Sequence, residues 1–318
     1  MSKPDLETFH ETSRRLDFVG PLESLLSEFR SGNIAHRDRT IEQSAIQSHL
    51  AEHVKAWDDV FPAFPDLPWK RRTITWENHR GRRDAYLERL IAAAVPKQEV
   101  SARLIVNPAT VAGMHPRRLA RAMPDYEIVG TDITSRWDRL YRIVLFWKHR
   151  GLHNYRFVRE SIFEPDMQRR PAVVVFFGSC GSLTDAAMDY AIAVNSPFLI
   201  CRSCCHENIS GNTKIVRRRR MVNHFFALKN FFFAIYKKEQ KGYHFSPRYY
   251  EDAYPRSEAA RAIMDSDTIL AVARNAPDSD ICRILIDLDR CLFLQENGYD
   301  VMYREELFFA HKRYDAAG

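Results

Sequence analysis

Three short segments of the sequence combine residue types that could hold a ligand or carry out chemistry. They are Asn107–His115, Gly178–Asp185 and Cys201–His206. The middle segment has two glycines among small polar residues, so its backbone could approach a ligand closely. The last segment gathers thiols and an imidazole, which are groups that bind zinc or take part in redox and acid–base chemistry. Ligand binding, metal binding and catalysis are therefore the chemistries to weigh.

A structural zinc site is not favoured in the cysteine-rich segment. Such sites draw on two separated ligand pairs, and the sequence offers no second pair, since Cys282 and Cys291 are isolated. Redox chemistry through Cys201 and Cys204 is a further alternative, but the surrounding pattern does not resemble thioredoxin. We expect no metal here. His206 is the candidate general base, or else a structural histidine.

The residues around Asp132 and Asn107 suggest a nucleoside site. Asp132 closes the second expected strand in Ile128-Val-Gly-Thr-Asp132, where an acidic side chain can bind both hydroxyls of a ribose. The alternative role is a helix N-cap. Nucleotide-binding first loops carry two or three glycines, whereas only Gly113 remains between Asn107 and His115. That loop is either a degenerate cofactor loop or a plain strand-to-helix connection.

Composition and charge narrow the class of protein. The chain has 318 residues, of which 45% are hydrophobic and 28% charged, as in a globular protein with a real core. No apolar run approaches the ~20 residues of a membrane-spanning helix, and no signal segment is expected, so the cysteines predict reduced thiols in the cytoplasm. The net charge is +6, with four charges gathered in Arg217–Arg220.

This arginine run leads into an aromatic segment, Met221–Phe233. Contact with the phosphates of RNA is one interpretation, supported by the second basic region at residues 69–83. A solvated basic edge, with the phenylalanines buried on one helix face, is the other.

The sequence pattern changes at about residue 99. Residues 1–98 space apolar residues three and four apart, which predicts a helical N-terminal extension. Residues 99–318 alternate short apolar runs with helical patterns, which predicts an α/β domain with a mostly parallel, doubly wound sheet. The expected strands are Arg103–Val106, Tyr126–Gly130, Tyr155–Val158, Val173–Phe177 and Pro197–Cys201, and the expected helices are Arg83–Ala94, Pro116–Met123, Ser135–His149 and Thr184–Val194. Ligands bind at the carboxyl ends of such strands.

Two motifs, separated by one helix and one strand, resemble a branch of the class I S-adenosylmethionine-dependent methyltransferases. This branch includes tRNA ribose methyltransferases. The two motifs are Ser179-Cys-Gly-Ser-Leu-Thr-Asp185 and Ser203-Cys-Cys-His206. The resemblance extends to Gly298–Tyr303, which looks like the closing strand of the sheet, preceded by a helix over Asp280–Asn297. It implies a Rossmann-like methyltransferase sheet with an antiparallel last strand.

The resemblance also implies a set of contacts. The residues that would surround S-adenosylmethionine are Asn107, Gly113, Asp132, Glu160, Ser161, Gly178, Ser179 and Cys180. The residues that would line the acceptor side are Cys204, Cys205, Arg217 and Arg218. The implied activity is methyl transfer to an oxygen or nitrogen nucleophile, with RNA or a small molecule as acceptor. The alternative is a catalytically inactive protein of this fold that serves binding or assembly, which the glycine-poor first loop favours.

Overall fold

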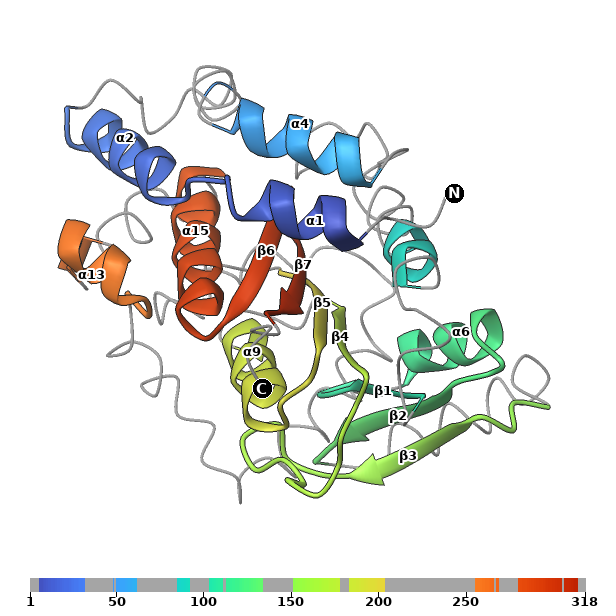
Figure 1. Ribbon diagram of the computed structural model, residues 1–318. Coiled ribbons are helices and arrows are strands. Elements are labelled where there is room, and N and C mark those ends of the chain that lie inside the picture. Colours follow the sequence, from blue (N-terminus) through green and yellow to red (C-terminus); the bar gives the residue numbers. More distant parts are fainter. Residues whose placement is uncertain are drawn as a thin grey trace, which may run out of the picture.

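A seven-stranded sheet organises the molecule (Figure 1). The computed structural model describes residues 6–31, 48, 50–61, 85–91, 103–110, 113–133, 151–177, 183–203, 255–265, 267–268, 280–304 and 306–313. The strands are β1 (Leu104–Asn107), β2 (Glu127–Asp132), β3 (Tyr155–Arg159), β4 (Val173–Phe177), β5 (Phe198–Arg202), β6 (Tyr299–Arg304) and β7 (Leu307–Lys312). Their order across the sheet is β3-β2-β1-β4-β5-β7-β6.

This topology confirms the predicted fold class. Strands β1 to β5 pair in parallel, and β7 runs antiparallel to both of its neighbours, β5 and β6. The chain therefore has the predicted Rossmann-like sheet, mostly parallel with an antiparallel last strand. The strand order reverses between β1 and β4, which is the position where sheets of this kind bind ligands.

The segment Gly298–Tyr303, expected as the closing strand, does form a strand at the edge of the sheet, but a further strand was not predicted. That segment forms β6, the edge strand, and a further strand, β7, inserts between it and β5. The helix before β6 is α15 (Asp280–Glu296), close to the predicted bounds.

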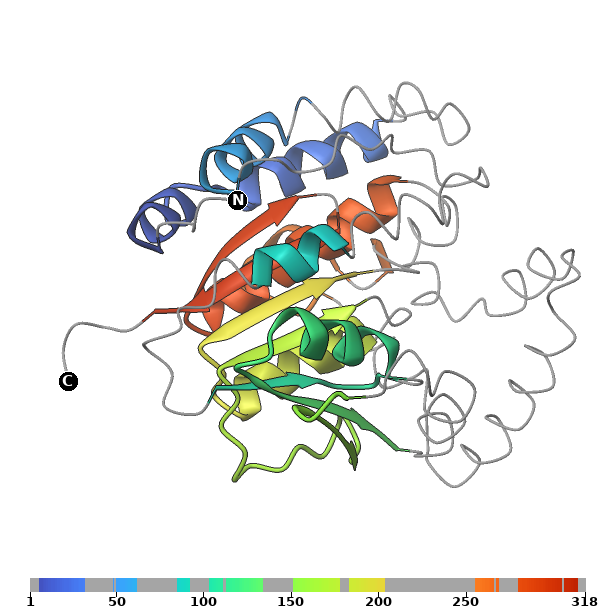
Figure 2. The same ribbon diagram turned by 90° about the vertical axis from the view of Figure 1, so that its right-hand side faces the viewer.

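Helices cover both faces of the sheet (Figure 2). The other helices that the structure bounds are α1 (Leu6–Ser13), α2 (Val19–Arg30), α4 (Ala51–Val60), α6 (Met114–Ala122), α9 (Leu183–Ala193) and α13 (Glu258–Ile263), and residues 85–91 are also helical. Along β4, Val174 and Phe176 face the core that holds α9 and α15, whereas Val173, Val175 and Phe177 face the core that holds α6 and residues 85–91. The strand is apolar throughout because both of its faces are buried.

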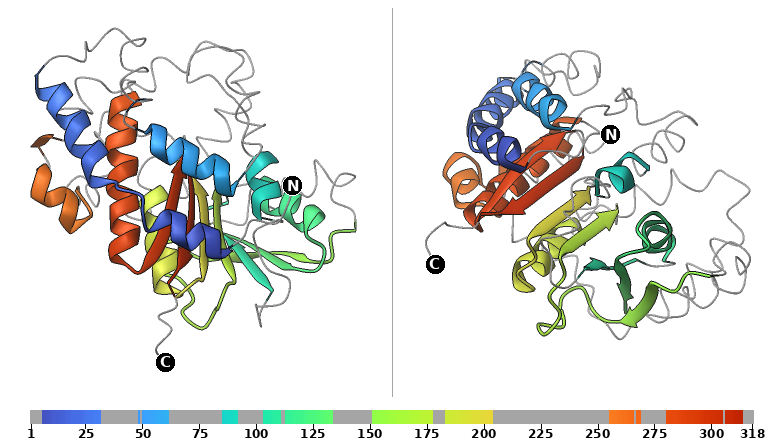
Figure 3. Two further views of the ribbon diagram at one scale, coloured as in Figure 1. Left: turned by 45° about the horizontal axis from the view of Figure 1, so that its top comes forward. Right: turned by 45° about the vertical axis from the view of Figure 1, so that its right-hand side comes forward.

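The N-terminal helices α1, α2 and α4 lie at the β6 edge of the sheet (Figure 3). Phe9 of α1 packs edge-on against Phe309 of β7, with ring centroids 5.0 Å apart. Leu22 and Leu25 of α2 belong to the same buried cluster as Ile284 of α15. The described parts of the first 98 residues are helical, as predicted. The division of the chain into regions 1–98 and 99–318 stays a prediction.

The described helices include none that is both long enough and apolar enough to cross a membrane. The predicted helix over Ser135–His149 lies outside the described residues.

Candidate functional site

The carboxyl ends of the central strands bring several of the predicted site residues to one edge of the sheet. Asn107 ends β1 and Asp132 ends β2, and both side chains are buried. In the parallel register Asn107 lies opposite Gly130, so β2 extends two residues past the end of β1. This step leaves Asp132 beyond the tip of β1, at the edge where ligands bind in such sheets.

Asn107 joins β1 to β4 at the point where the strand order reverses. Its Nδ2 donates a hydrogen bond of 2.7 Å to the carbonyl oxygen of Val175. A carboxylate could not make this bond, since it has no donor when ionised. The Oδ1 atom is buried and accepts no hydrogen bond from the described residues. Buried polar atoms in proteins nearly always have a partner, so this oxygen fits a donor brought by a ligand or a water.

The first loop returns against β2 instead of standing away from it. The Thr110 N–H donates to the carbonyl oxygen of Thr131 at 2.9 Å, and the Gly113 N–H donates to the carbonyl of Thr110 at 3.0 Å. Gly113 has a φ of 67° immediately before α6, in the left-handed region that glycine adopts without strain. The one glycine of this loop therefore serves the turn into α6.

The close approach between this loop and β2 depends on a glycine that the sequence analysis did not select. A Cβ on Gly130 would lie 3.0 Å from Cγ2 of Thr110, and 3.1 Å from both Cγ of Pro116 and the Tyr155 hydroxyl. A glycine inside a strand is a known signal of close backbone approach, so the sequence held the clue.

The predicted adenine contacts at the end of β3 already have protein partners. The Glu160 carboxylate pairs with Arg169 and accepts a 2.8 Å hydrogen bond from the Tyr190 hydroxyl. Burial, reinforced by the Glu160 charge, raises the pKa of Tyr190, so its hydroxyl stays a donor. The Ser161 hydroxyl oxygen accepts the Phe163 N–H at 3.2 Å. Glu160 is thus part of a structural network, and an adenine contact at Glu160 or Ser161 stays a prediction.

An aromatic pair closes the end of β4. The imidazole of His115, in the first turn of α6, stacks on the ring of Phe177, with centroids 4.6 Å apart and planes at 6°. The sequence analysis named His115 only as the end of the first loop. The pair joins the start of α6 to the end of β4 at this edge of the sheet, and its Phe177 ring is buried.

The remaining predicted site residues lie outside the described residues. They are Gly178, Ser179 and Cys180, the acceptor-side residues Cys204, Cys205, Arg217 and Arg218, and the candidate base His206. Their roles stay predictions, as does the RNA contact through Arg217–Arg220 and residues 69–83.

In the described part of the cysteine-rich segment, the thiol has low reactivity. Cys201 lies on β5 and is fully buried, and burial raises the pKa of its thiol well above the usual value. A thiol in this state is a poor nucleophile and a poor redox group. Within the described ranges, no group of three or more His, Cys, Asp and Glu side chains is arranged to hold a metal ion.

Comparisons with known proteins give partial similarities to solved methyltransferase structures. No protein-family model matches the sequence, and no curated protein matches it. The aminoglycoside resistance methyltransferase NpmB1 is 17% identical with a TM-score of 0.27, over 31% of this chain and 55% of that one. Precorrin-6y C5,15-methyltransferase from Geobacter metallireducens is 13% identical with a TM-score of 0.31, over 51% and 78%.

The CMeT domain of the citrinin polyketide synthase is 14% identical with a TM-score of 0.29, over 61% of this chain and 48% of that chain. The chain spans little more than half the length of NpmB1, and 60% of the length of the antibiotic-resistance methyltransferase Kmr.

Proposed function

We propose that the chain binds S-adenosylmethionine at the carboxyl edge of β1, β2 and β4 and transfers its methyl group to an oxygen or nitrogen nucleophile. The observation that carries this proposal is the buried, unsatisfied Oδ1 of Asn107 at the strand-order reversal, beside a strand that ends in Asp132. An acceptor oxygen at this place suits the ammonium group of the methionine moiety. A carboxylate one strand away suits the ribose hydroxyls.

The described residues fit such a ligand in three further ways. The turn at Gly113 directs the start of α6 toward the same edge of the sheet. The His115–Phe177 stack fixes the start of α6 against the end of β4. Gly130 lets Thr110 of the first loop lie against β2, where its N–H bonds to the carbonyl of Thr131, the residue before Asp132. Each feature comes from a different element, and all belong to the edge where parallel sheets bind ligands.

In this function the protein contributes mainly alignment. The cofactor, when bound, supplies a methyl group that is already activated as a sulfonium. Asp132 would hold the ribose, and Asn107 would hold the amino group, which together fix where the reactive methyl lies. His206 is the proposed base for an acceptor that keeps its proton, and Cys204, Cys205, Arg217 and Arg218 are proposed for the acceptor side.

The acceptor class is proposed from charge. The arginines at 217–220 and the basic residues between 69 and 83 support an RNA acceptor. Binding to bulk tRNA that weakens steeply with salt, with a slope reduced by neutralising Arg217–Arg220, would support RNA. Binding that is absent or insensitive to salt would support a small molecule instead. Cys201 and Cys291 are free thiols, which supports the proposed cytoplasmic setting.

Titration calorimetry with S-adenosylmethionine and S-adenosylhomocysteine tests the proposal directly. We expect saturable binding by the unmodified chain, and a loss of roughly tenfold or more in affinity for Asp132→Ala and for Asn107→Ala, which remove the two proposed anchors. Ser196→Ala is the control, because Ser196 precedes β5 at the opposite end of the sheet, and it should leave affinity nearly unchanged. If the unmodified chain shows no saturable binding at millimolar cofactor, the enzyme proposal fails and a binding or assembly role takes its place.

A further inference from the structure

The aspartate of the Leu-Thr-Asp motif faces the protein interior. Asp185 lies in the first turn of α9 and forms a two-pronged ion pair with Arg290 of α15. Arg290 donates from Nε to Oδ1 at 2.8 Å and from Nη2 to Oδ2 at 2.9 Å. Both side chains are fully buried. This fork geometry fixes the relative orientation of two groups more strictly than a single contact does.

The hydrogen-bonded chain continues from Arg290 to the second motif. Arg290 donates from Nη1 to Oδ1 of Asp287 at 2.9 Å. The other oxygen of Asp287 accepts the hydroxyl of Ser203 at 2.9 Å and the hydroxyl of Tyr303 at 3.1 Å. Burial raises the pKa of Tyr303 well above its usual value, which keeps that hydroxyl a donor. Ser203 is the first residue of the Ser-Cys-Cys-His motif, so one continuous network connects both motifs through α15.

Ser203 is also held from a second side. Its N–H donates to the carbonyl oxygen of Glu306 at 2.8 Å, in the turn between β6 and β7. Glu306 has a φ of 73°, an unusual conformation for a residue with a side chain, and its carboxylate accepts from Arg283 of α15 at 3.0 Å. The chain leaving β5 is therefore attached both to α15 and to the β6–β7 turn.

A buried charged network contributes little net free energy to the stability of a fold. The desolvation of fully buried charges offsets most of their attraction, so apolar residues of similar volume often stabilise as well or better. What a fully satisfied buried network does provide is a single fixed geometry. Its two ends here are Asp185, three positions after residue 182, and Ser203, which directly precedes residues 204–206. Residues 178–180 are predicted cofactor contacts, and residues 204–206 include the proposed base.

We infer that the Asp185–Arg290–Asp287–Ser203 chain, with Tyr303, is a positioning device that fixes the start of α9 and the end of β5 relative to each other. This inference rests on the proposed function for the role of those segments. These residues act as positioning residues, through the parts of the chain that they hold. The device makes α15 the shared support of the start of α9 and the end of β5, which are separate in sequence.

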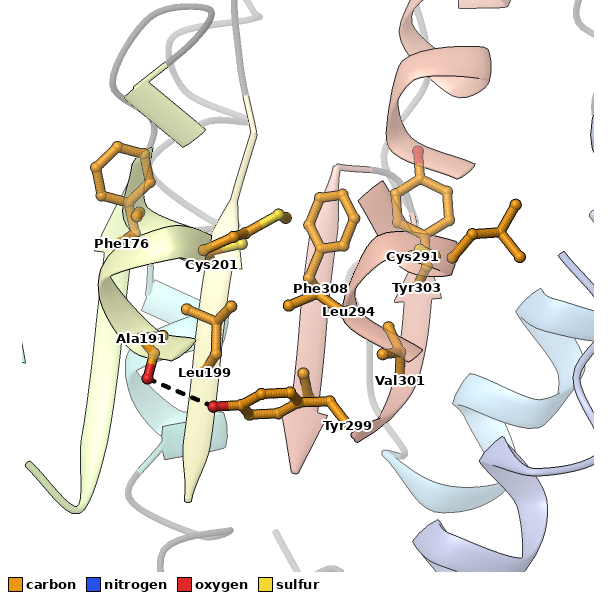
Figure 4. Close-up of a cluster of buried hydrophobic side chains, with 14 of the residues drawn as sticks. Phe176, Ala191, Leu199, Cys201, Cys291, Leu294, Tyr299, Val301, Tyr303 and Phe308 are labelled. Carbon is orange, nitrogen blue, oxygen red and sulfur yellow. Dashed lines mark hydrogen bonds between the residues drawn. The ribbon is translucent and has the colours of Figure 1, made fainter. Parts of the chain in front are cut away.

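The chain offers a matched set of control variants at the opposite end of the same strands. Figure 4 shows Tyr303 and Tyr299, both on β6; the Tyr303 hydroxyl points along the strand, away from Tyr299, and the Tyr299 hydroxyl reaches sideways to the carbonyl oxygen of Ala191. Tyr299 donates to the carbonyl oxygen of Ser196 at 2.8 Å, and Ser196 donates to the carbonyl of Phe198 at the start of β5. Asp300, next to Tyr299, is a second buried aspartate. The test set is Ser203→Ala, Tyr303→Phe and Asp287→Asn, and the control set is Ser196→Ala, Tyr299→Phe and Asp300→Asn.

Two measurements decide the inference. The first is the affinity for S-adenosylhomocysteine, measured by calorimetry. It should fall about tenfold in the test set, which is the smaller loss expected for residues that support binding residues from behind. It should change less than about twofold in the control set, because distant sites act independently. The second is amide hydrogen exchange, which should accelerate in peptides that span 178–182 and 204–206 in the test set alone.

Equal effects of the two sets on affinity and on exchange would overturn the inference, because a merely stabilising network would show them. If the unmodified chain does not bind S-adenosylhomocysteine, the proposed function fails while the exchange measurement still decides the positioning role. If Asp287→Asn does not fold, Ser203→Ala and Tyr303→Phe decide alone, since each removes one hydroxyl and leaves every charge paired.

Discussion

The two ends of strands β5 and β6 carry similar polar residues in different surroundings. At the carboxyl end of β5, Ser203, Tyr303 and Asp287 join charged partners that are almost completely buried. At the amino end, Asp300 pairs with His10, Arg14 and Arg313, and the side chains of these two arginines are 59% and 38% exposed.

The two networks therefore differ in whether water can replace a hydrogen bond that a mutation removes. Water can take over the bonds of a half-exposed arginine, whereas a sealed network has no substitute for a lost member. The amino-end cluster attaches α1 to the sheet edge, as an ordinary surface contact does. The carboxyl-end network holds a fixed arrangement next to the candidate site. The two ends therefore differ in how deeply their networks are buried from solvent, and not in the types of residue that form them.

The largest effect should come from removing the central arginine of the sealed network. Arg290→Met removes the ion pairs to buried Asp185 and Asp287 and leaves Asp185 with Arg256 at 3.4 Å, which should lower the free energy of unfolding by about 3–5 kcal/mol. Arg313→Met at the other end should cost less than about 1 kcal/mol, because its partner keeps other donors and the site is partly wet. Urea denaturation followed by circular dichroism measures both. Similar losses would remove the distinction between the two ends.

Two glycines, one at each edge of the sheet, allow the backbone at the two edges to be compared. Gly130→Ala at the carboxyl edge places a Cβ 3.0 Å from Thr110, which should cost about 1–3 kcal/mol and displace the first loop. Gly298 precedes β6 at the amino edge, with a φ of 81° and open space around it. Gly298→Ala should cost about 1–2 kcal/mol from backbone strain alone.

Affinity for S-adenosylhomocysteine separates the two glycine variants more clearly than stability does. We expect Gly130→Ala to weaken binding, because it moves the loop beside Asp132, and Gly298→Ala to leave binding unchanged. Loss of affinity in Gly298→Ala would mean that the candidate site responds to any disturbance of the sheet.

Acid should lower the stability of the fold through His311, in the cluster at the amino end of β6. Burial lowers the pKa of His311 to about 4, with the neighbouring His10 as a further cause. The unfolded chain, with an ordinary histidine pKa of about 6.5, then binds a proton more readily than the folded chain between these values. The stability that comes from neutral His311 is complete above pH 6.5 and is lost as the pH falls toward 4, with a slope of at most about 1.4 kcal/mol per pH unit.

Unfolding measured in urea at several pH values between 7 and 4 checks this, with His311→Gln as the comparison. The variant should show a flatter dependence of stability on pH than the unmodified chain does. An unchanged slope would assign the acid sensitivity to other groups.

Much of the sheet could be predicted from the sequence, because buried parallel strands have continuous apolar runs. Val173–Phe177 is observed with the predicted bounds, and its central position explains why. Strand β7 was missed although Leu307–Lys312 is largely apolar. The turn before it gives no local signal, since Glu306 adopts a positive φ where glycine or asparagine is usual. Contacts with Ser203 and Arg283, distant in sequence, fix that turn.

The site was less predictable because its residues are defined by partners far along the chain. Asn107 and Asp132 lie at the predicted edge, since strand ends follow from the pattern. Glu160 and Asp185 are acidic residues in promising segments, yet Arg169 and Arg290 neutralise them inside the fold. Asp185 and Arg290 are 105 positions apart, and no local motif shows such a pairing.

The smallest effect should come from Arg14, whose Nε lies 3.2 Å from Asp300. Because its side chain is 59% exposed, solvent screens the pair, and Arg14→Ala should change the free energy of unfolding by less than about 1 kcal/mol. That difference should shrink further in 1 M salt, where the screening length is about 3 Å. The matched variant is Arg256→Ala, at a side chain only 7% exposed between Asp185 and Asp189, and it should cost more at any salt concentration. A large effect of Arg14→Ala that survives high salt would place Asp300 in a sealed environment like that of Asp287, and seclusion would no longer separate the two ends.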